Sequence, residues 1–479
     1  EIDAKGMAVA PGFINMLSWA DQTILRDGRS TSDIKQGVTF EVFGEGWSPG
    51  PVRRQTTKPV DSLWTTLDGY FRFALKKGIS CNIASFVGAT SVRIHEMNYS
   101  ARKPTPQEME RMKRLVKEAM EQGAMGLGTS LIYAPANYAS TEELIELARV
   151  ASSYGGMYIT HMRSESDQII EGLNETFRIA REANIAAEIY HLKINNSRNW
   201  NKIDTVLSLI DQARAEGLKI TANMYPYIAS GTGLSARLPI WVQEGGARQM
   251  RKRLADPAIR KKVLYEMQSG IPQKNSDPEN VVLTGFRLDS LNRIYKGKRL
   301  SQVSLMHGKN ADETVIDLVV RDKSRIEAIY YLQSEDNVRK IVRLPYVSFG
   351  SDAGSYTLSP DSTLLSDHPR AFGTFARVLG KYVRDEKLIT LPDAIRRLTQ
   401  LPASNLKLKK RGNLKPGFYA DIVIFDPAAV RDKATFEKPH VYSEGVIDVF
   451  VNGIQVLENG IHTGAKPGRV IRGPGYKRK

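Results

Sequence analysis

The sequence predicts an α/β protein, a (β/α)8 TIM-like barrel followed by a small β domain that forms part of a β-sandwich. Two observations lead to this fold. Short apolar runs typical of buried strands alternate with segments of helical periodicity, and eight strand–helix units are the number that closes a parallel sheet into a barrel. The runs lie at residues 12–17, 38–44, 82–88, 124–129, 157–161, 187–191, 219–224 and 347–352.

Capping motifs mark the starts of two helices between these strands. Thr105-Pro-Gln-Glu108 is a capping box with proline at the first helical position, and Ser140-Thr-Glu-Glu143 starts a second helix in the same way. Apolar residues follow the first motif at helical spacing: Met112, Leu115, Val116, Ala119 and Met120. Both segments are therefore predicted to be helices that connect neighbouring parallel strands.

One connection is much longer than barrel connections usually are. Between the seventh and eighth strands lies an inserted segment at about 232–300, with a basic helical stretch at 248–267 and a polar loop at 273–280. An insertion over the carboxyl face of a barrel is often a lid. An ordinary peripheral subdomain is an equally good interpretation.

The sequence changes character after residue 411. The stretch 411–417 is rich in turn residues, 420–425 is typical of a strand, and 449–456 is typical of a hairpin with an Asn452-Gly453 turn. A small β domain at 411–479 is therefore predicted to follow a barrel at 12–410.

The composition is that of an ordinary globular protein, with 41% hydrophobic and 25% charged residues in a chain of 479. No apolar stretch is long enough for a membrane-spanning helix. The net charge of +16 is compatible with nucleic-acid binding, but the basic residues are spread along the chain without interleaved aromatic residues, which favours a solvated basic surface. We expect a small-molecule substrate with no nucleic acid and no membrane as partner, and the oligomeric state is not predicted.

The single cysteine, Cys81, excludes an internal disulfide and fits a reducing compartment. The chain begins at Glu1 without an initiator methionine or a signal-peptide pattern. We therefore expect the natural product to be longer, and a cytoplasmic or a periplasmic location stays open.

Four residues that could bind a metal stand at the ends of predicted strands. Glu45 follows the second strand, His161 and His191 end the fifth and sixth, and Asp352 ends the eighth. Barrel active sites lie at this carboxyl face. Imidazole and carboxylate suit zinc, and a nearby carboxylate can take a proton from water and pass it to a leaving amine.

A structural role is the alternative for each histidine taken singly. Two histidines at consecutive strand ends, with acids at two other ends, nevertheless favour a metal site. The remaining histidines considered are interpreted as structural or surface residues: His95, His307, His440 and His462.

Short motifs along the chain together resemble a known family. They are Val9-Ala-Pro-Gly-Phe-Ile14, Gln36-Gly-Val-Thr39, Ile159-Thr-His-Met-Arg163, His191-Leu-Lys193, Tyr225-Pro-Tyr227, Leu238-Pro-Ile-Trp241, Gly350-Ser-Asp352, His368-Pro-Arg370 and Gly417-Phe-Tyr-Ala-Asp-Ile-Val423. In this order they resemble the N-acyl-D-amino-acid deacylase (D-aminoacylase) branch of the amidohydrolase superfamily over nearly the whole chain.

The resemblance implies roles for particular residues. His161 and His191 match zinc ligands, Glu45 stands near the strand-two position that completes the tight zinc site, and Asp352 matches the general base, which can also touch the metal. The residues implied to hold a substrate carboxylate are Lys193, Tyr225 and Arg370. A planar guanidinium suits that task because it can donate two parallel hydrogen bonds. Without the resemblance, surface or packing roles would be favoured for these three.

Two departures from the family pattern affect these expectations. Leu17 and Trp19 stand where the family usually has a His-x-His pair, and neither side chain can ligate zinc, so one zinc ion is expected. The N-terminal β segment of the family is reduced to a remnant at 1–11. The hairpin near Asn452 is therefore expected to expose an unpaired edge.

The leading hypothesis is zinc-dependent hydrolysis of the amide bond of N-acyl-D-amino acids, in which Asp352 activates water and later protonates the amine. The D configuration rests on the resemblance alone. One rival is another amidohydrolase, acting on a cyclic amide or a dipeptide. A second rival is a non-catalytic binding protein that has lost the strand-one histidine pair, and a third, a nucleic-acid-binding protein, rests on net charge alone.

Overall fold

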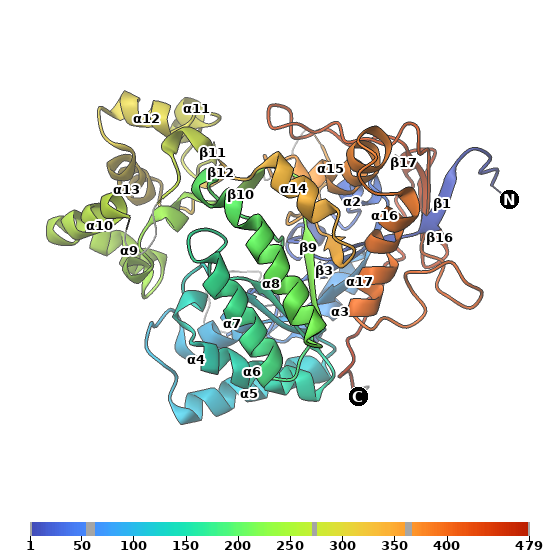
Figure 1. Ribbon diagram of the computed structural model, residues 1–479, viewed down its shortest axis with the longest axis horizontal. Coiled ribbons are helices and arrows are strands. Elements are labelled where there is room, and N and C mark those ends of the chain that lie inside the picture. The colour runs from blue at the N-terminus through green and yellow to red at the C-terminus, as the bar shows by residue number, and fades with distance from the viewer. Residues whose placement is uncertain (1, 54–62, 271–274, 360–365, 478–479) are drawn as a thin grey trace.

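A ring of parallel strands lies at the centre of the computed structural model, which describes residues 2–53, 63–270, 275–359 and 366–477 (Figure 1). Two sheets, with strand orders β2-β3-β4 and β13-β9-β8-β7-β6-β5, make up the ring. Its strands are β2 (Phe13–Asn15), β3 (Val38–Phe43), β4 (Asn82–Ser85), β5 (Val87–Gly88), β6 (Gly126–Ser130), β7 (Met157–His161), β8 (Ala187–Ile189), β9 (Ile220–Met224) and β13 (Val347–Phe349).

Backbone hydrogen bonds join the two sheets on both sides. Only Phe86 separates β4 from β5, and its amide donates to the Phe43 carbonyl at 2.8 Å. On the other side, the Met16 amide donates to the Phe349 carbonyl at 3.2 Å, and Ser18 forms a parallel bridge with Ala353. Each of the eight predicted strands is therefore present, the third as the pair β4 and β5.

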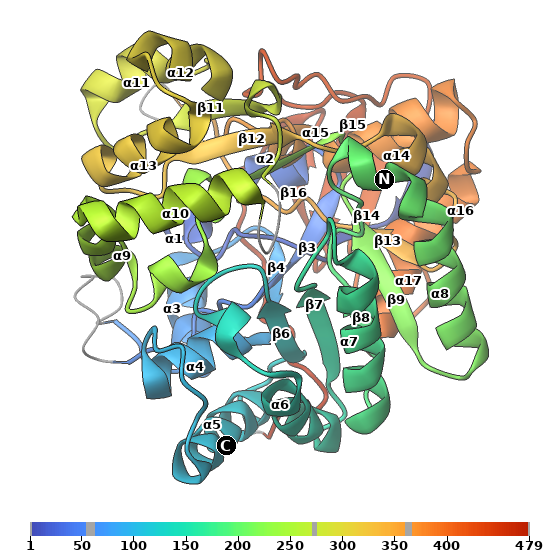
Figure 2. The same cartoon turned by 60° about the vertical axis from the view of Figure 1, so that its left-hand side comes forward.

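Helices follow the strands in alternation and cover the outside of the ring, so the protein has an α/β fold (Figure 2). Those outside the insertion are α1 (Thr23–Arg26), α2 (Thr31–Ile34), α3 (Leu67–Lys77), α4 (Ala89–Met97), α5 (Pro106–Glu121), α6 (Thr141–Ser153), α7 (Ile169–Glu182), α8 (Ile203–Ala215), α14 (Glu335–Val342), α15 (Arg370–Arg377), α16 (Leu391–Leu398) and α17 (Gln400–Asn405). The predicted capping box of α5 is confirmed, because Thr105 and Glu108 cap each other's backbone amides. Ser140 likewise accepts from the Glu143 amide at the start of α6.

Apolar side chains fill the inside of the ring and the layer between the ring and the helices. The inner cluster draws its side chains from successive strands and includes Ile14, Phe40, Phe86, Met157, Ile159 and Tyr190. Strand residues of the opposite parity, such as Phe43 and Ile83, join the outer cluster with the helices. This alternation leaves the carboxyl ends of the strands as the place where polar side chains gather.

The segment between β9 and α14 forms a lobe with its own sheet and its own apolar cluster (Figure 1). An antiparallel sheet of order β10-β12-β11 holds it together. Its strands and helices are β10 (Ala229–Gly233), α9 (Ala247–Ala255), α10 (Pro257–Ser269), β11 (Val281–Gly285), α11 (Asp289–Tyr295), α12 (Leu300–His307), α13 (Ala311–Asp322) and β12 (Glu327–Tyr331). The lobe extends beyond the predicted range of 232–300 at both ends, because β10 and β12 pair with each other across the whole insertion.

Two details of the insertion differ from the sequence interpretation. The basic stretch at 248–267 is two helices rather than one, broken where Asp256 caps α10 and Pro257 begins it. Of the predicted polar loop, residues 273–274 lie outside the described residues, and 278–280 form a short 3-10 turn.

The C-terminal strands form a five-stranded sheet of order β1-β14-β15-β16-β17. These are β1 (Ala8–Pro11), β14 (Ile422–Phe425), β15 (Val446–Val451), β16 (Ile454–Glu458) and β17 (Ile461–His462). The predicted hairpin is confirmed, with Asn452 and Gly453 both at positive φ in its turn. The expectation of an unpaired hairpin edge is wrong, because β14 pairs with β15 on one side of the hairpin and β17 pairs with β16 on the other.

Among the described residues, none of the helices has both the length and the apolar character needed to cross a membrane. Cys81 is a buried, unpaired thiol.

Candidate metal centre

Glu45, His161 and His191 meet at one buried point at the carboxyl ends of the ring strands. The Glu45 Oε1 atom lies 2.7 Å from His161 Nδ1 and 3.0 Å from His191 Nε2. One potential ligand atom from each residue lies within 4.8 Å of the others. The structure thus brings together three of the four residues that the sequence singled out as possible metal ligands.

Strand ends and local backbone conformation place these three side chains. His161 is the last residue of β7, and His191 comes two residues after β8 with a φ of 35°. Glu45 lies between Gly44 and Gly46, both at positive φ. Glycine is required on both sides, because a Cβ would come within 2.6 Å of the Phe86 carbonyl at Gly44 and within 2.5 Å of the Ser130 side chain at Gly46. The chain can therefore turn sharply at the end of β3 and point Glu45 at the histidines.

Asp352 lies beside this cluster, and both of its carboxylate oxygens have partners. Its Oδ1 accepts a hydrogen bond of 3.1 Å from the Trp19 indole, and its Oδ2 lies 2.6 Å from Nη1 of Arg370. The residue has a φ of 49°, and its amide donates to the Leu17 carbonyl at 2.8 Å. The Asp352 carboxylate is therefore held beside the three-residue cluster by Trp19 on one oxygen and Arg370 on the other.

Lys193, Tyr225 and Arg370 are gathered around one aromatic ring. The Arg370 guanidinium lies 4.6 Å from the centre of the Tyr225 ring, and the Lys193 ammonium lies 5.6 Å from it. All three side chains are buried, and the Tyr225 hydroxyl donates to Ser230 at 3.1 Å. The two cations that face this ring form a cationic corner of the site, and each of them also pairs with a carboxylate at 2.6 Å.

Glu165 is a member of the site that sequence reasoning missed. Its Oε1 lies 2.6 Å from Lys193 Nζ and 2.9 Å from His191 Nδ1, and its Oε2 lies 3.6 Å from His161 Nε2. The only signal in the sequence is an acid four residues after a strand-end histidine, and such an acid is common in loops. Glu165 therefore links Lys193 to the histidine pair.

Electrostatic contacts set the protonation of these buried groups. Burial by itself would raise the pKa of Glu165, but the charges of Lys193, His161 and His191 outweigh it and hold that pKa well below its usual range. Burial and Lys193 oppose a charge on His191, but Glu165 and Glu45 outweigh them and raise the His191 pKa to about 10. The carboxylates of Glu165 and Glu45 therefore stabilise a positive charge on the His191 ring.

The donor set fits a zinc ion. Two imidazoles and one carboxylate are ligands that zinc takes in hydrolytic sites, where a fourth position stays available to water. The nitrogens that face Glu45 Oε1 are Nδ1 of His161 and Nε2 of His191, so each of the three residues offers one atom at the same buried point. The two rings lie 4.4 Å apart and nearly perpendicular, so both can present a nitrogen to one ion.

The strand-one positions lack metal ligands, as the sequence indicated. Leu17 is only 1% exposed and packs in the apolar cluster inside the ring. Trp19 lies at the cavity wall, and its indole N–H donates to Glu45 Oε2 at 2.9 Å as well as to Asp352.

A cavity of about 1260 Å³ opens over the centre, and both the ring and the inserted lobe line it. From the lobe come residues such as Phe286, Lys296 and Arg325, so the insertion forms one wall of the cavity. A cavity of this size accommodates a small organic molecule.

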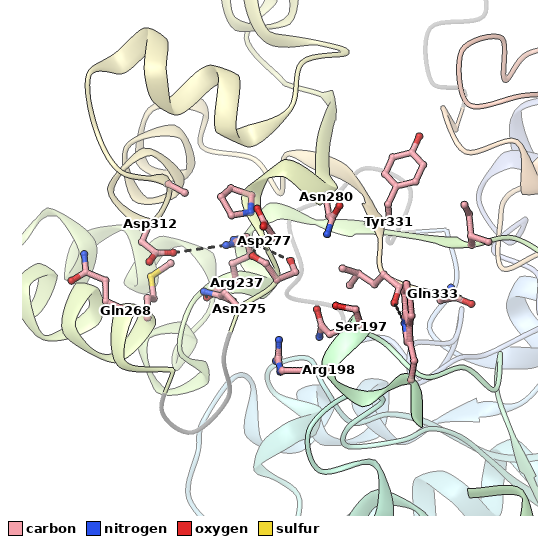
Figure 3. Close-up of a pocket in the computed structure, with 18 residues that line it drawn as sticks. Ser197, Arg198, Arg237, Gln268, Asn275, Asp277, Asn280, Asp312, Tyr331 and Gln333 are labelled. Atoms are coloured by element: carbon pink, nitrogen blue, oxygen red, sulfur yellow. Dashed lines mark hydrogen bonds and ion pairs between the residues drawn. The ribbon is translucent and has the colours of Figure 1, made fainter. Parts of the chain in front are cut away.

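A second cavity of about 840 Å³ adjoins the first one, between the start of α8 and the lobe (Figure 3). Arg237 lines both cavities and lies 3.9 Å from Asp312. Asn196 and Leu332 also line both cavities, so the two cavities share part of their walls.

A cluster of two histidines and a carboxylate that opens onto a cavity defines the class, a metal-dependent hydrolase. The chain belongs to the amidohydrolase family, whose sequence profile matches residues 1–457. The resemblance to N-acyl-D-amino-acid deacylases that the sequence indicated is confirmed by the relatives.

Curated and solved relatives agree with this assignment. A D-aminoacylase of Alcaligenes xylosoxydans xylosoxydans is 34% identical over 98% of this chain and 88% of its own length. A solved D-aminoacylase, described for the one-metal activation and second-metal attenuation of its binuclear centre, superposes with a TM-score of 0.81 at 32% identity, covering 98% of this chain and 90% of its own. An N-acyl-D-glutamate deacylase of Bordetella bronchiseptica, solved with zinc and a phosphonate inhibitor, gives 0.80 at 29% identity with the same coverage.

Proposed function

We propose that this protein hydrolyses the amide bond of N-acyl-D-amino acids at a single zinc ion, releasing a carboxylate and a free amino acid. The observation that carries the proposal is the buried cluster of Glu45, His161 and His191, with Asp352 beside it and a cationic corner on the same cavity. The curated relatives with deacylase names span nearly the whole chain, which supports the same activity.

Lys193, Tyr225 and Arg370 bind the substrate carboxylate in this proposal. The two cations lie over the Tyr225 ring, and the Arg370 guanidinium can grip a carboxylate through parallel hydrogen bonds. Because Arg370 also contacts Asp352, a carboxylate at this corner places the neighbouring amide next to the general base. This corner favours an acyl amino acid with a free carboxylate over a cyclic amide.

Zinc held by Glu45, His161 and His191 would supply a Lewis acid and lower the pKa of water. Asp352 lies outside this three-residue cluster and stays a proposed further ligand. Asp352 accepts a proton from the attacking water as the water oxygen bonds to the acyl carbon. Asp352 then delivers that proton to the amide nitrogen, and the carbon–nitrogen bond breaks. The second water proton stays on the new carboxyl group and passes to the released amine, so the products are the acyl carboxylate and the ammonium form of the amino acid, and atoms and charge balance.

We also propose the domain division that fits this function. Residues 12–410 form a (β/α)8 barrel that carries the site, and residues 411–479 together with the strand in 1–11 form the small β domain. The lobe acts as a cover of the cavity, since its residues line the wall opposite the ring strands.

The second candidate is a non-catalytic binding protein, and the substituted pair Leu17 and Trp19 favours it. Such a protein would keep the cationic corner and the cavity and lack turnover. The convergence of two imidazoles and a carboxylate on one buried point argues against it, because this is a donor set that zinc takes in hydrolytic sites.

One experiment separates these two candidates. Zinc per chain is measured in purified protein, together with hydrolysis of a panel of N-acetyl-D- and N-acetyl-L-amino acids. We expect one zinc and turnover of D substrates, and we expect His161→Ala to lose both. His95→Ala, which changes a histidine outside the site, is the control. Metal-free protein that stays inactive with added zinc would overturn the proposal.

A further inference from the structure

The indole N–H of Trp19 is shared between the two carboxylates of the site. It donates to Glu45 Oε2 at 2.9 Å and to Asp352 Oδ1 at 3.1 Å. An indole has one N–H and no acceptor, so this is one proton shared by two acceptors. The contact links the metal-ligand cluster directly to the general base.

The other oxygen of each carboxylate is already engaged. Glu45 Oε1 faces His161 and His191, and Asp352 Oδ2 faces Arg370. The two remaining oxygens point at the same nitrogen, and two carboxylates that face each other need a positive or donor group between them. In this chain the Trp19 N–H is the donor there.

The backbone fixes Trp19 and Asp352 relative to each other. The Trp19 amide donates to the Ala353 carbonyl at 2.9 Å, and the Asp352 amide donates to the Leu17 carbonyl at 2.8 Å. These bonds belong to the seam where the first and last strands of the ring meet. The indole is therefore placed by the ring closure itself and does not depend on a mobile loop.

A second metal ion between Glu45 and Asp352 would need the two oxygens that Trp19 holds, and it would need further ligands. Leu17 and Trp19 cannot supply them. The D-aminoacylase described above carries a binuclear metal centre whose second metal attenuates activity. In this chain a fixed hydrogen-bond donor, the Trp19 N–H, lies between the two carboxylates.

We propose that Trp19 is a positioning residue that takes the place of a second metal ion. Its N–H holds Glu45 and Asp352 in the geometry of the site and restricts the centre to one metal. The expected effect of Trp19 on turnover rests on the proposed function. The expected effect of Trp19 on metal binding does not. The Trp19 N–H donates to Glu45 and Asp352, so Trp19 acts on the metal ligand and on the general base.

The test counts zinc and separates kcat from KM. Metal-free wild-type protein is titrated with zinc, and bound metal is measured by isothermal titration and elemental analysis. We expect one zinc in the wild type, two in Leu17→His/Trp19→His, and no loss of wild-type activity at excess zinc. Trp19→Phe keeps an aromatic ring without the N–H, and we expect it to bind one zinc with kcat at least about tenfold lower and KM little changed.

Trp241→Phe is the matched control, because the Trp241 indole also donates to a carboxylate, that of Glu266 at 2.6 Å, but within the lobe. We expect its zinc count and kcat to equal those of the wild type. Two zinc ions in the wild type, or a Trp19→Phe kcat equal to that of Trp241→Phe, would overturn the inference. So would a folded double-histidine variant that binds one zinc.

The outcomes keep this inference and the proposed function distinct. If no variant turns over any N-acyl amino acid while the zinc count rises from one to two in the double variant, the deacylase proposal fails and the role of Trp19 stands. If circular dichroism shows that the double variant does not fold, the comparison of Trp19→Phe with Trp241→Phe decides.

Discussion

At the residue scale, the buried carboxylate of Glu165 contacts both Lys193 and the histidine pair. It holds Lys193 on one oxygen at 2.6 Å and approaches both histidines. Partners of this kind orient metal ligands and raise their basicity. Glu165 is therefore the residue through which the carboxylate-binding corner and the metal centre depend on each other.

We expect Glu165→Gln to lower zinc affinity about 10- to 100-fold, because the neutral amide no longer favours the metal-binding orientation of His191. Competition with a chelator of known affinity measures the change. Glu143→Gln is the control, since Glu143 pairs with buried Arg93 at 2.5 Å away from the site. Equal zinc affinities in the two variants would show that Glu165 has only a packing role.

Arg370 combines two contacts that lysine cannot reproduce together. Its guanidinium lies over the Tyr225 ring and pairs with Asp352. We expect Arg370→Lys to lower kcat/KM by roughly 10- to 100-fold, mostly through KM, because a point charge cannot stack and grip a carboxylate at once.

Arg377→Lys controls for the loss of a stacked arginine. Arg377 lies 4.7 Å from the Tyr227 ring centre and pairs with Asp432 at 2.8 Å. Steady-state kinetics on the best substrate compares the two variants. Similar losses in both would contradict a role of Arg370 in substrate binding.

At the scale of elements, the packing of α2 on β3 buries two acids. Asp33 on α2 and Glu41 on β3 are at most 1% exposed, and the Glu41 oxygens make no hydrogen bond to any described residue. Burial raises the pKa of Asp33 to about 6, and burial together with the Asp33 charge raises the pKa of Glu41 well above its usual range. The folded protein therefore keeps protons that the unfolded chain has lost above pH 4.5.

This difference sets the sign of a pH dependence. A raised pKa in the fold means that the folded state binds more protons, so stability falls as the pH rises from about 4 through the folded pKa values. We expect Glu41→Gln to raise the free energy of unfolding at pH 8 by about 1–3 kcal/mol, with little change at pH 4.5. Urea unfolding at both pH values tests this.

Glu118→Gln, an exposed change on α5, is the control for a general effect of lost charge. A Glu41→Gln protein that gains equally at both pH values would show that the gain does not come from ionisation of Glu41. A loss of stability at pH 8 would show that the ionised carboxylate is stabilising.

At the scale of the whole molecule, the three-residue cluster joins side chains from distant strands of the ring. Glu45 follows β3, His161 is the last residue of β7, and His191 follows β8. A metal that binds only the folded ring stabilises it by about 2.7 kcal/mol at 100 times its Kd. We therefore expect chelation to lower Tm and added zinc to restore it.

His161→Ala should abolish the effect of zinc on Tm, because it removes one of the three ligands. His307→Ala, in the lobe, should keep the full effect. Differential scanning calorimetry with and without zinc measures both variants. An equal rise of Tm in His161→Ala would mean that the zinc binds elsewhere.

The sequence by itself determined the secondary-structure elements and the positions of the three residues that cluster as candidate metal ligands. Alternating periodicity and capping motifs depend on neighbours a few residues apart, so they identified the eight ring strands, the α5 cap and the Asn452-Gly453 hairpin. Strand ends identified Glu45, His161 and His191, because the carboxyl ends of parallel strands meet at one edge. The motifs of the family gave roles to the residues around Tyr225, and the corner that they form is consistent with those roles.

Only the tertiary structure decided which side chains touch across the ring. Trp19 and Asp352 are 333 residues apart and meet because the first and last strands pair. Glu165 lies in a loop without periodicity, and its contacts depend on how that loop folds over Lys193. The extent of the lobe and the pairing of both hairpin edges also depended on long-range strand partners, which local patterns do not encode.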